Sequence, residues 1–198
     1  VGGGGRSGTK AAGTAQEPRQ ATGVKVGEVS GASAIVWMRV THKAARNTEG
    51  MVRRGRPTEV LPPEVSTDAL EGSAPGAPGR VRLRYGVRES LAGAQAKATD
   101  WVEVSAARNY THQFRLTGLK PATVYYFAAE TSGPRGSPRH GALRGRFETA
   151  PPAQAHADVL FTVMTCQAYR SLDHPDGFHI YESMRKLAPK FVVPAGDL

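Results

Sequence analysis

Between residues 22 and 149 the chain places apolar and polar side chains alternately, in short runs that turn-forming residues separate. An alternation with a period of two is typical of strands that bury one face. The runs that fit this pattern are 23–29, 34–40, 80–87, 101–104, 110–116, 124–130 and 143–149. Short strands at this spacing, with turns between them, predict an all-β sandwich.

The run 34–40 separates its side chains into two sets. One face carries Ala34, Val36, Met38 and Val40, and the opposite face carries Ile35, Trp37 and Arg39. A tryptophan on the second strand of a small β-domain usually packs between the two sheets. We therefore expect the Trp37 ring to lie in the core.

Three stretches lack this pattern. Residues 1–21 are rich in Gly, Ala, Thr and basic residues with little to bury, so we predict a disordered N-terminal segment. Residues 44–79 are rich in Pro, Gly, Glu and Arg, and we interpret them as a long insertion in a sandwich domain that spans 22–149. Residues 150–157 are interpreted as a linker to a second domain at 158–198.

A corner motif occurs in the run Gly-Leu-Lys-Pro-Ala-Thr-Val-Tyr-Tyr at residues 118–126. In this pattern Leu119 fills the core at the end of one strand, and Pro121 fixes the turn. A Tyr in the following strand is expected to return a hydroxyl hydrogen bond to the backbone of the corner. The motif resembles the corner of fibronectin type III domains, which has the same Leu, Pro and Tyr.

From residue 158 the pattern changes to two apolar runs separated by a helical repeat. The first run, 159–165, ends at Cys166, and the second, 191–193, ends at Gly196-Asp197. Between them, apolar residues at helical spacing predict a helix from about residue 176 or 177 to 187. This order is typical of a βαβ unit, whose parallel strands are buried on both faces.

Function in parallel sheets sits at the carboxyl ends of the strands. Cys166 and Asp197 both occupy that position, so we expect a thiolate and a carboxylate to meet in one crevice. A bridging carboxylate can hold two cations for phosphate-ester hydrolysis. A thiolate selects a softer metal than calcium, with Fe or Zn2+ as candidates, while calcium would prefer the oxygen-rich side. We therefore hypothesise that Cys166 and Asp197 are metal ligands.

Other interpretations of these residues stay open. Cys166 could be an inert core thiol or a catalytic nucleophile, and Asp197 could be a carboxylate that caps the backbone at a strand end. Atoms suited to a zinc site, although at no standard spacing, belong to Cys166, Asp173, His174 and His179. In the simpler interpretation Asp176 caps the helix and the two histidines are solvated.

The amino-acid composition narrows the range of possible binding partners only slightly. The formal net charge of +9 fits nucleic acid, an anionic surface or an anionic substrate such as a phosphate ester. The arginines are spread over several segments, which is also typical of the solvated surface of a basic protein. A single cysteine excludes an internal disulfide. No apolar run approaches the ~18 residues of a membrane span, and the N-terminus lacks a signal-peptide pattern.

Several segments together make a family resemblance specific. They are Ser33 to Val40, Gly118 to Phe127, Phe147 to Pro151, and the strand ends at Cys166 and Gly196-Asp197. In combination they resemble the PhoD-like alkaline phosphatase/phosphodiesterase family over about Thr22 to Leu198, with the 44–79 insertion as an interruption.

The resemblance implies a mixed fold, in which an all-β fibronectin III-like sandwich precedes the first βαβ unit of an α/β metallophosphoesterase domain, truncated at Leu198. It implies an exported, periplasmic or secreted hydrolase that cleaves phosphate mono- and diesters by metal-activated water, with Fe3+ and Ca2+ as cofactors. By position, Cys166 matches the family's iron-binding cysteine and Asp197 its metal-bridging aspartate. The remaining ligands of the family follow Leu198, so we expect this fragment to be inactive alone.

Two rival functions belong to other classes. The chain could be an extracellular β-sandwich module for binding or adhesion without catalytic activity. It could also bind nucleic acid through its arginine-rich strands and the insertion, which predicts steeply salt-dependent DNA binding. Under the phosphoesterase hypothesis, nucleic acid is a partner only as a phosphodiester substrate.

Overall fold

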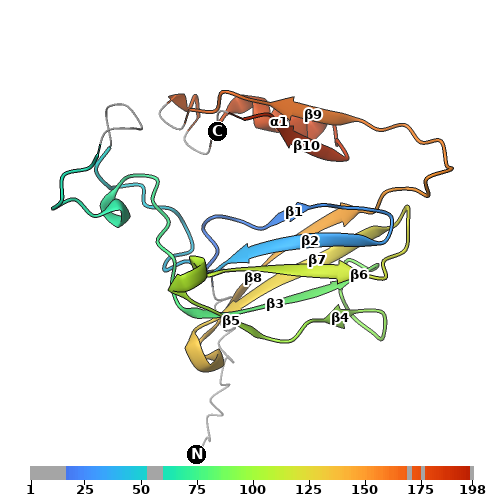
Figure 1. Cartoon of the computed structure of the whole chain (residues 1–198), viewed down its shortest axis with the longest axis horizontal. Helices are drawn as coiled ribbons and strands as arrows, with labels where there is room; N and C mark the ends of the chain where they lie inside the picture. Colours follow the sequence, from blue (N-terminus) through green and yellow to red (C-terminus); the bar gives the residue numbers. More distant parts are fainter. Residues whose placement is uncertain (1–16, 53–59, 169–170, 175–176, 197–198) are drawn as a thin grey trace, which may run out of the picture.

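The computed structural model describes residues 17–52, 60–168, 171–174 and 177–196 (Figure 1). Its larger part is a β-sandwich, and a smaller unit with two strands and one helix follows it. The strands of the sandwich are β1 (Lys25–Gly27), β2 (Ser33–Arg39), β3 (Gly79–Gly86), β4 (Lys97–Ala98), β5 (Val102–Val104), β6 (Thr111–Thr117), β7 (Val124–Ser132) and β8 (Arg139–Glu148). Three short 3-10 turns, η1 (Thr67–Ala69), η2 (Ala106–Arg108) and η3 (Pro134–Gly136), lie in the connections.

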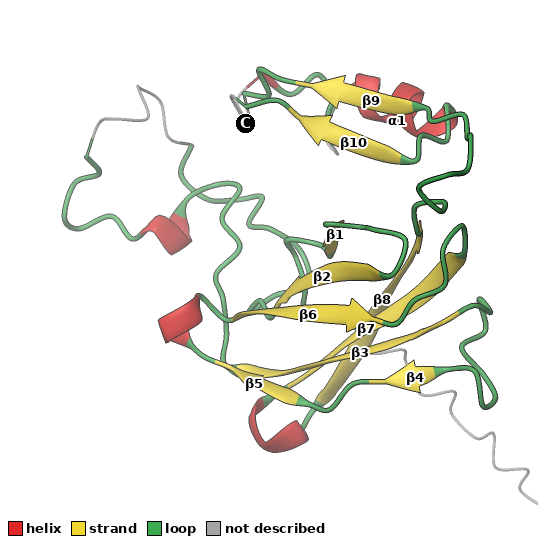
Figure 2. Cartoon of the chain, turned by 45° about the vertical axis from the view of Figure 1, so that its right-hand side comes forward, coloured by secondary structure: helices red, strands yellow, loops and turns green. Residues whose placement is uncertain are grey.

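Two antiparallel sheets form the sandwich (Figure 2). One has the order β1-β2-β6, and the other has the order β4-β3-β7-β8. β5 also pairs with β3, at residues 79–81, whereas β4 pairs with residues 84 and 85 of the same strand. The sheets face each other across one hydrophobic core, which the inward side chains of both supply. The fully buried aliphatic members of this core include Val36, Met38, Val40, Val81 and Leu83. This arrangement confirms the predicted sandwich and its seven strands, and it adds the two-residue strand β4, which the sequence pattern missed.

Trp37 lies on the outer face of β2, so the prediction that it is a core residue was wrong. Its neighbours Val36 and Met38 are 0% exposed, whereas Trp37 is only partly buried. The Lys25 ammonium lies 5.9 Å from the centroid of the Trp37 ring, above the outer surface of the sheet. Since successive side chains of a strand point to opposite faces, burying Val36 and Met38 forces Trp37 outward.

The corner before β7 has the predicted geometry. Leu119 is 6% exposed and belongs to the core cluster. The Tyr125 hydroxyl accepts a hydrogen bond of 2.9 Å from the backbone N–H of Lys120. The Tyr125 ring also stacks on Phe147 of β8, with ring centroids 5.7 Å apart. The motif therefore ties the loop between β6 and β7 to the core.

Residues 17–21 make defined contacts with the sandwich, which differs from the prediction of disorder up to residue 21. The Gln20 side chain is 3% exposed and donates a hydrogen bond of 2.9 Å to the carbonyl oxygen of Ala129 in β7. The carbonyl oxygen of Arg19 accepts from the backbone N–H of Thr41 at 2.8 Å. These polar contacts fix a segment that offers almost no apolar side chains. Residues 1–16 lie outside the described residues.

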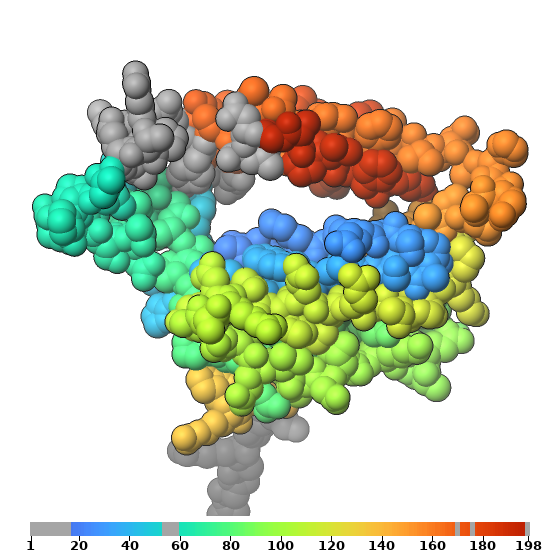
Figure 3. Space-filling view, viewed as in Figure 1, coloured from blue at the N-terminus to red at the C-terminus, as the bar shows by residue number. Residues whose placement is uncertain are grey.

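The stretch predicted as an insertion begins as a paired excursion from the sandwich. The backbone N–H of Asn47 donates to Ser73, and the N–H of Gly72 donates back to Asn47, each at 2.7 Å. Arg46 also forms an ion pair with Glu71 at 2.7 Å. The outgoing and returning segments of this excursion therefore hydrogen-bond to each other where they leave the sheets. Figure 3 shows the excursion standing out from the sandwich. Residues 53–59 lie outside the described residues.

The smaller unit contains β9 (Phe161–Met164), α1 (His179–Lys186) and β10 (Phe191–Pro194). β9 and β10 pair in parallel, with Phe161 opposite Phe191 and Met164 opposite Pro194, which confirms the predicted βαβ order. Their side chains are not buried on both faces as the pattern predicted: Phe161 is 49% exposed and Phe191 is 50% exposed. The reason is that no further strand pairs with these two in the part of the chain that the structure describes.

An ion pair joins the smaller unit to the sandwich. The Lys190 ammonium, just before β10, pairs with the carboxylate of Glu148 at the end of β8. In the described ranges, none of the helices has the length and apolar character needed to cross a lipid bilayer.

We predict that Tyr125→Phe destabilises the sandwich by about 1 kcal/mol, because it removes the hydroxyl that accepts from the Lys120 N–H while keeping the stacked ring. Urea denaturation followed by tryptophan fluorescence measures the change. Tyr126→Phe is the matched control, since the next residue faces outward and is only half-buried. Equal losses in both variants would show that the corner hydrogen bond does not contribute.

We predict that Gly145→Ala lowers the free energy of unfolding by roughly 1–3 kcal/mol through overpacking. A Cβ atom at residue 145 would lie 2.5 Å from the Phe127 ring, which is buried in the core. Gly27→Ala is the control, because a Cβ there meets nothing within 4 Å and the residue also lies in a strand. Thermal denaturation of both variants tests the difference, and a stable Gly145→Ala protein would contradict it.

Candidate functional site

The carboxyl ends of β9 and β10 lie side by side. The backbone N–H of Ala195 donates to the carbonyl oxygen of Met164 at 2.8 Å, which continues the parallel ladder past the last strand residue. One residue further, the Thr165 hydroxyl donates a hydrogen bond of 3.1 Å to the carbonyl oxygen of Gly196. Thr165 and Gly196 thus connect the two strand ends directly. Cys166 and Asp197 are the next residues in the sequence after these two.

Cys166 occupies a turn at the end of β9. Its backbone has φ +56°, in the left-handed region that non-glycine residues rarely adopt. The thiol is exposed, and its Sγ atom lies 3.7 Å from the Thr165 hydroxyl oxygen. Among the described residues the thiol is not buried, and its role as a metal ligand, a core thiol or a nucleophile stays a prediction.

Asp197, the second predicted ligand, lies outside the described residues. The structure places the residue before it, Gly196, with φ +95°, a conformation that glycine adopts without strain. A glycine at this position therefore lets the backbone turn sharply just before Asp197 in the sequence. Whether the Asp197 carboxylate meets the Cys166 thiol stays a prediction.

Two polar residues support the Cys166 turn, and sequence reasoning had not assigned either a role. The Gln167 side-chain amide donates to the carbonyl oxygen of Thr165 at 2.8 Å. The hydroxyl of Tyr181, in α1, donates a hydrogen bond of 2.6 Å to the side-chain oxygen Oε1 of Gln167. The sequence pattern placed Tyr181 only among the apolar residues at helical spacing that predict the helix. The position of its hydroxyl depends on how the helix returns toward the strand end.

Three of the four residues proposed as zinc donors, Asp173, His174 and His179, lie together at the start of α1. Asp173 accepts a hydrogen bond of 2.9 Å from the His179 backbone N–H, so its carboxylate binds the first turn of α1. The His174 and His179 rings meet edge to face, with centroids 5.0 Å apart. No group of three or more His, Cys, Asp or Glu side chains that could hold a metal ion occurs among the described residues. Asp176, the predicted helix cap, lies outside them.

A pocket of about 400 Å³ lies beside the start of α1. It is lined by His174, Gly177, Phe178, His179, Tyr181, Glu182 and Arg185. Within it, the Arg185 guanidinium forms two hydrogen bonds to the Glu182 carboxylate, at 2.6 and 2.7 Å. These bonds lower the pKa of the Glu182 carboxyl below its ordinary value. The pair is therefore charged at neutral pH, and the pocket contains both signs of charge.

Comparison with known proteins supports the resemblance found in the sequence. The family model described as the N-terminal domain of PhoD-like phosphatases matches residues 7–151. No curated protein matches the chain. A solved structure described as that of PhoD aligns at 17% identity with a TM-score of 0.51, covering 77% of this chain and 23% of that one. At that identity the likeness shows a shared fold.

A fibronectin type III domain of the human collagen alpha-1(XX) chain also aligns, at 18% identity with a TM-score of 0.37, covering 78% of this chain and 97% of that domain.

This chain spans less than a quarter of the length of the PhoD chain that it matches. Because the matched family model covers residues 7–151, which is most of the sequence, the chain belongs to the PhoD-like phosphatase family through its N-terminal domain.

Proposed function

We propose that this chain is the N-terminal part of an exported, metal-dependent phosphoesterase that hydrolyses phosphate mono- or diesters. The observation that supports this most directly is the contact between Thr165 and Gly196, which joins the two strand ends that precede Cys166 and Asp197. Membership of the PhoD-like phosphatase family gives the reaction class. The natural substrate class is then a phosphate ester, with nucleic acid included only as a phosphodiester.

In this proposal Cys166 and Asp197 are ligands of a metal centre. The Cys166 thiol is exposed, and the neighbouring strand end leads to the Asp197 carboxylate. A thiolate and a carboxylate together suit a site that holds one softer metal and one hard metal. Family resemblance favours Fe3+ and Ca2+, and Zn2+ also suits a thiolate with a carboxylate. Such metals supply Lewis acidity toward phosphoryl oxygens and lower the pKa of water.

The residues around Cys166 have a positioning role in the proposal. Thr165 holds the two strand ends at one separation, and Gln167 fixes the carbonyl of Thr165. Tyr181 connects this turn to α1. Preorganised donors of this kind determine how well a ligand is oriented toward its metal. With fewer than three donor side chains together among the described residues, further ligands must come from other parts of the protein.

We predict that Cys166→Ala, made in the protein encoded by the complete gene, lowers bound metal and phosphoesterase activity by at least about 100-fold, since changing even an outer-shell partner typically costs 10–100-fold. Metal content by mass spectrometry and hydrolysis of p-nitrophenyl phosphate and bis(p-nitrophenyl) phosphate measure the effect. The 198-residue chain alone should hydrolyse neither ester.

Thr162→Val is the matched control, because Thr162 lies in β9, the strand that leads to Cys166, and its hydroxyl has no hydrogen-bond partner within the described part of the chain. This variant should keep both metal and activity. Full activity in Cys166→Ala would remove the thiol from the metal centre. A complete protein that binds metal but hydrolyses neither ester would instead favour the binding-module function.

A further inference from the structure

The outer face of the sheet that contains β3, β7 and β8 is rich in arginine. Alternation along β3 places Val81 and Leu83 in the core and turns the intervening arginines outward. The same alternation in β8 leaves its arginines exposed. The outward cations on the two strands are Arg80, Arg82, Arg84, Arg139, Arg144 and Arg146. All six are arginines, whose planar guanidinium groups bind phosphate in a bidentate manner.

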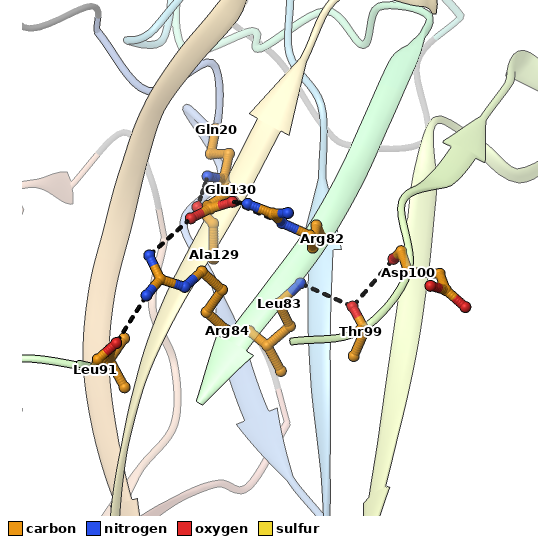
Figure 4. Close-up of polar contacts among 9 residues, drawn as sticks. All are labelled: Gln20, Arg82, Leu83, Arg84, Leu91, Thr99, Asp100, Ala129 and Glu130. Atoms are coloured by element: carbon orange, nitrogen blue, oxygen red, sulfur yellow. Dashed lines mark hydrogen bonds and ion pairs between the residues drawn. The ribbon is translucent and has the colours of Figure 1, made fainter. Parts of the chain in front are cut away.

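Part of this charge is already neutralised at the centre of the face. Glu130 of β7 forms ion pairs with Arg82 and Arg84, which flank it (Figure 4). Arg84 also donates a hydrogen bond of 2.7 Å to the carbonyl oxygen of Leu91. One carboxylate is thus shared by two guanidinium groups, so the middle of the face keeps less unpaired positive charge than its number of arginines suggests. The unbalanced charge lies toward the β8 edge.

At one end of the face, Trp101 is surrounded by guanidinium groups. The Arg139 and Arg82 guanidinium carbons lie 4.4 Å and 4.7 Å from the centroid of its ring. Arg80 lies 6.0 Å from the same centroid. Stacking on an aromatic ring orients an arginine without neutralising its charge.

Arg144 and Arg146 form the most accessible part of the face. Both are exposed, and neither has an acidic partner within ion-pair distance among the residues that the structure describes. They line a pocket of about 200 Å³ together with Tyr126, Phe127, Gly145 and Glu89. Tyr126 pairs with Arg146 across the strands, so a half-buried aromatic ring lies next to two guanidinium groups.

We propose that this outer face, centred on Arg144, Arg146 and Tyr126, is a docking surface for single-stranded nucleic acid. Alternate residues of a strand are about 7 Å apart, which is comparable to the separation of successive phosphates in an extended single strand. The two arginines therefore contact neighbouring phosphates, and the Tyr126 ring stacks on an unpaired base. A basic surface with an interleaved aromatic ring is the usual arrangement for binding single strands without sequence preference.

Two features favour a single strand over other polyanions. Stacking on Tyr126 requires a base that is not paired, which disfavours a duplex. A membrane surface would call for exposed apolar side chains beside the arginines, and the large exposed hydrophobic residues of the described chain lie elsewhere, on the excursion, the hairpin after β3 and the β9–β10 unit. This surface belongs to the sandwich alone, so the proposal does not depend on the phosphoesterase activity.

The test is fluorescence anisotropy of labelled oligothymidylate with the 198-residue chain, in EDTA and over a series of salt concentrations. We expect Arg144→Ala/Arg146→Ala to weaken binding on the order of tenfold at low salt, and to reduce the slope of log K against log salt by about 1.4, at ~0.7 per lost phosphate contact. Glu89→Gln, which removes the carboxylate that lines the pocket, should tighten binding.

Arg108→Ala/Arg115→Ala is the matched control, because it removes the same charge from exposed positions before and within β6 of the opposite sheet. This variant should keep the affinity and slope of the parent chain. Equal losses in the two double variants would mean that net charge alone attracts the strand, which overturns the proposal. Tighter, arginine-dependent binding to duplex DNA or to phosphatidylglycerol vesicles would overturn it as well.

Discussion

The alternation of inward and outward side chains along β3, β7 and β8 is the constraint on which most of this structure depends. It buries Leu83 and Phe127 between the two sheets and, by the same geometry, turns the arginines of β3 and β8 to the outer face. Core and charged surface are thus two consequences of one pattern. A slip of one residue in register would reverse both at once, placing guanidinium groups between the sheets.

The second constraint is the parallel pairing of β9 with β10. Parallel pairing brings the carboxyl ends of both strands to the same edge, where the Thr165 hydroxyl reaches Gly196. An antiparallel pair would send Cys166 and Asp197 to opposite ends of the unit. The proposed metal centre therefore depends on chain direction as much as on the donor residues. The phenyl rings of Phe161 and Phe191 stack on each other across this pair, although each is about half exposed.

The two proposed functions use different parts of the chain. Catalysis is assigned to the strand ends of the small unit, whereas nucleic-acid docking is assigned to the outer face of the sandwich. The ion pair between Lys190 and Glu148 is a direct contact between these parts, and Glu148 ends the same strand that carries Arg144 and Arg146. A phosphodiester polymer bound on β8 would thus lie on the strand that connects, through the linker, to the smaller unit.

The sequence by itself determined the strands, the Leu119 and Tyr125 corner, the order of the βαβ unit and the family, because each depends on local periodicity or a short motif. Only the tertiary structure decided the outward position of Trp37, the burial of Gln20, the hydrogen bond from Tyr181 to Gln167, and the gathering of distant arginines on one face. These features depend on which segments meet across the sheets, and contacts between residues far apart in sequence leave no local pattern.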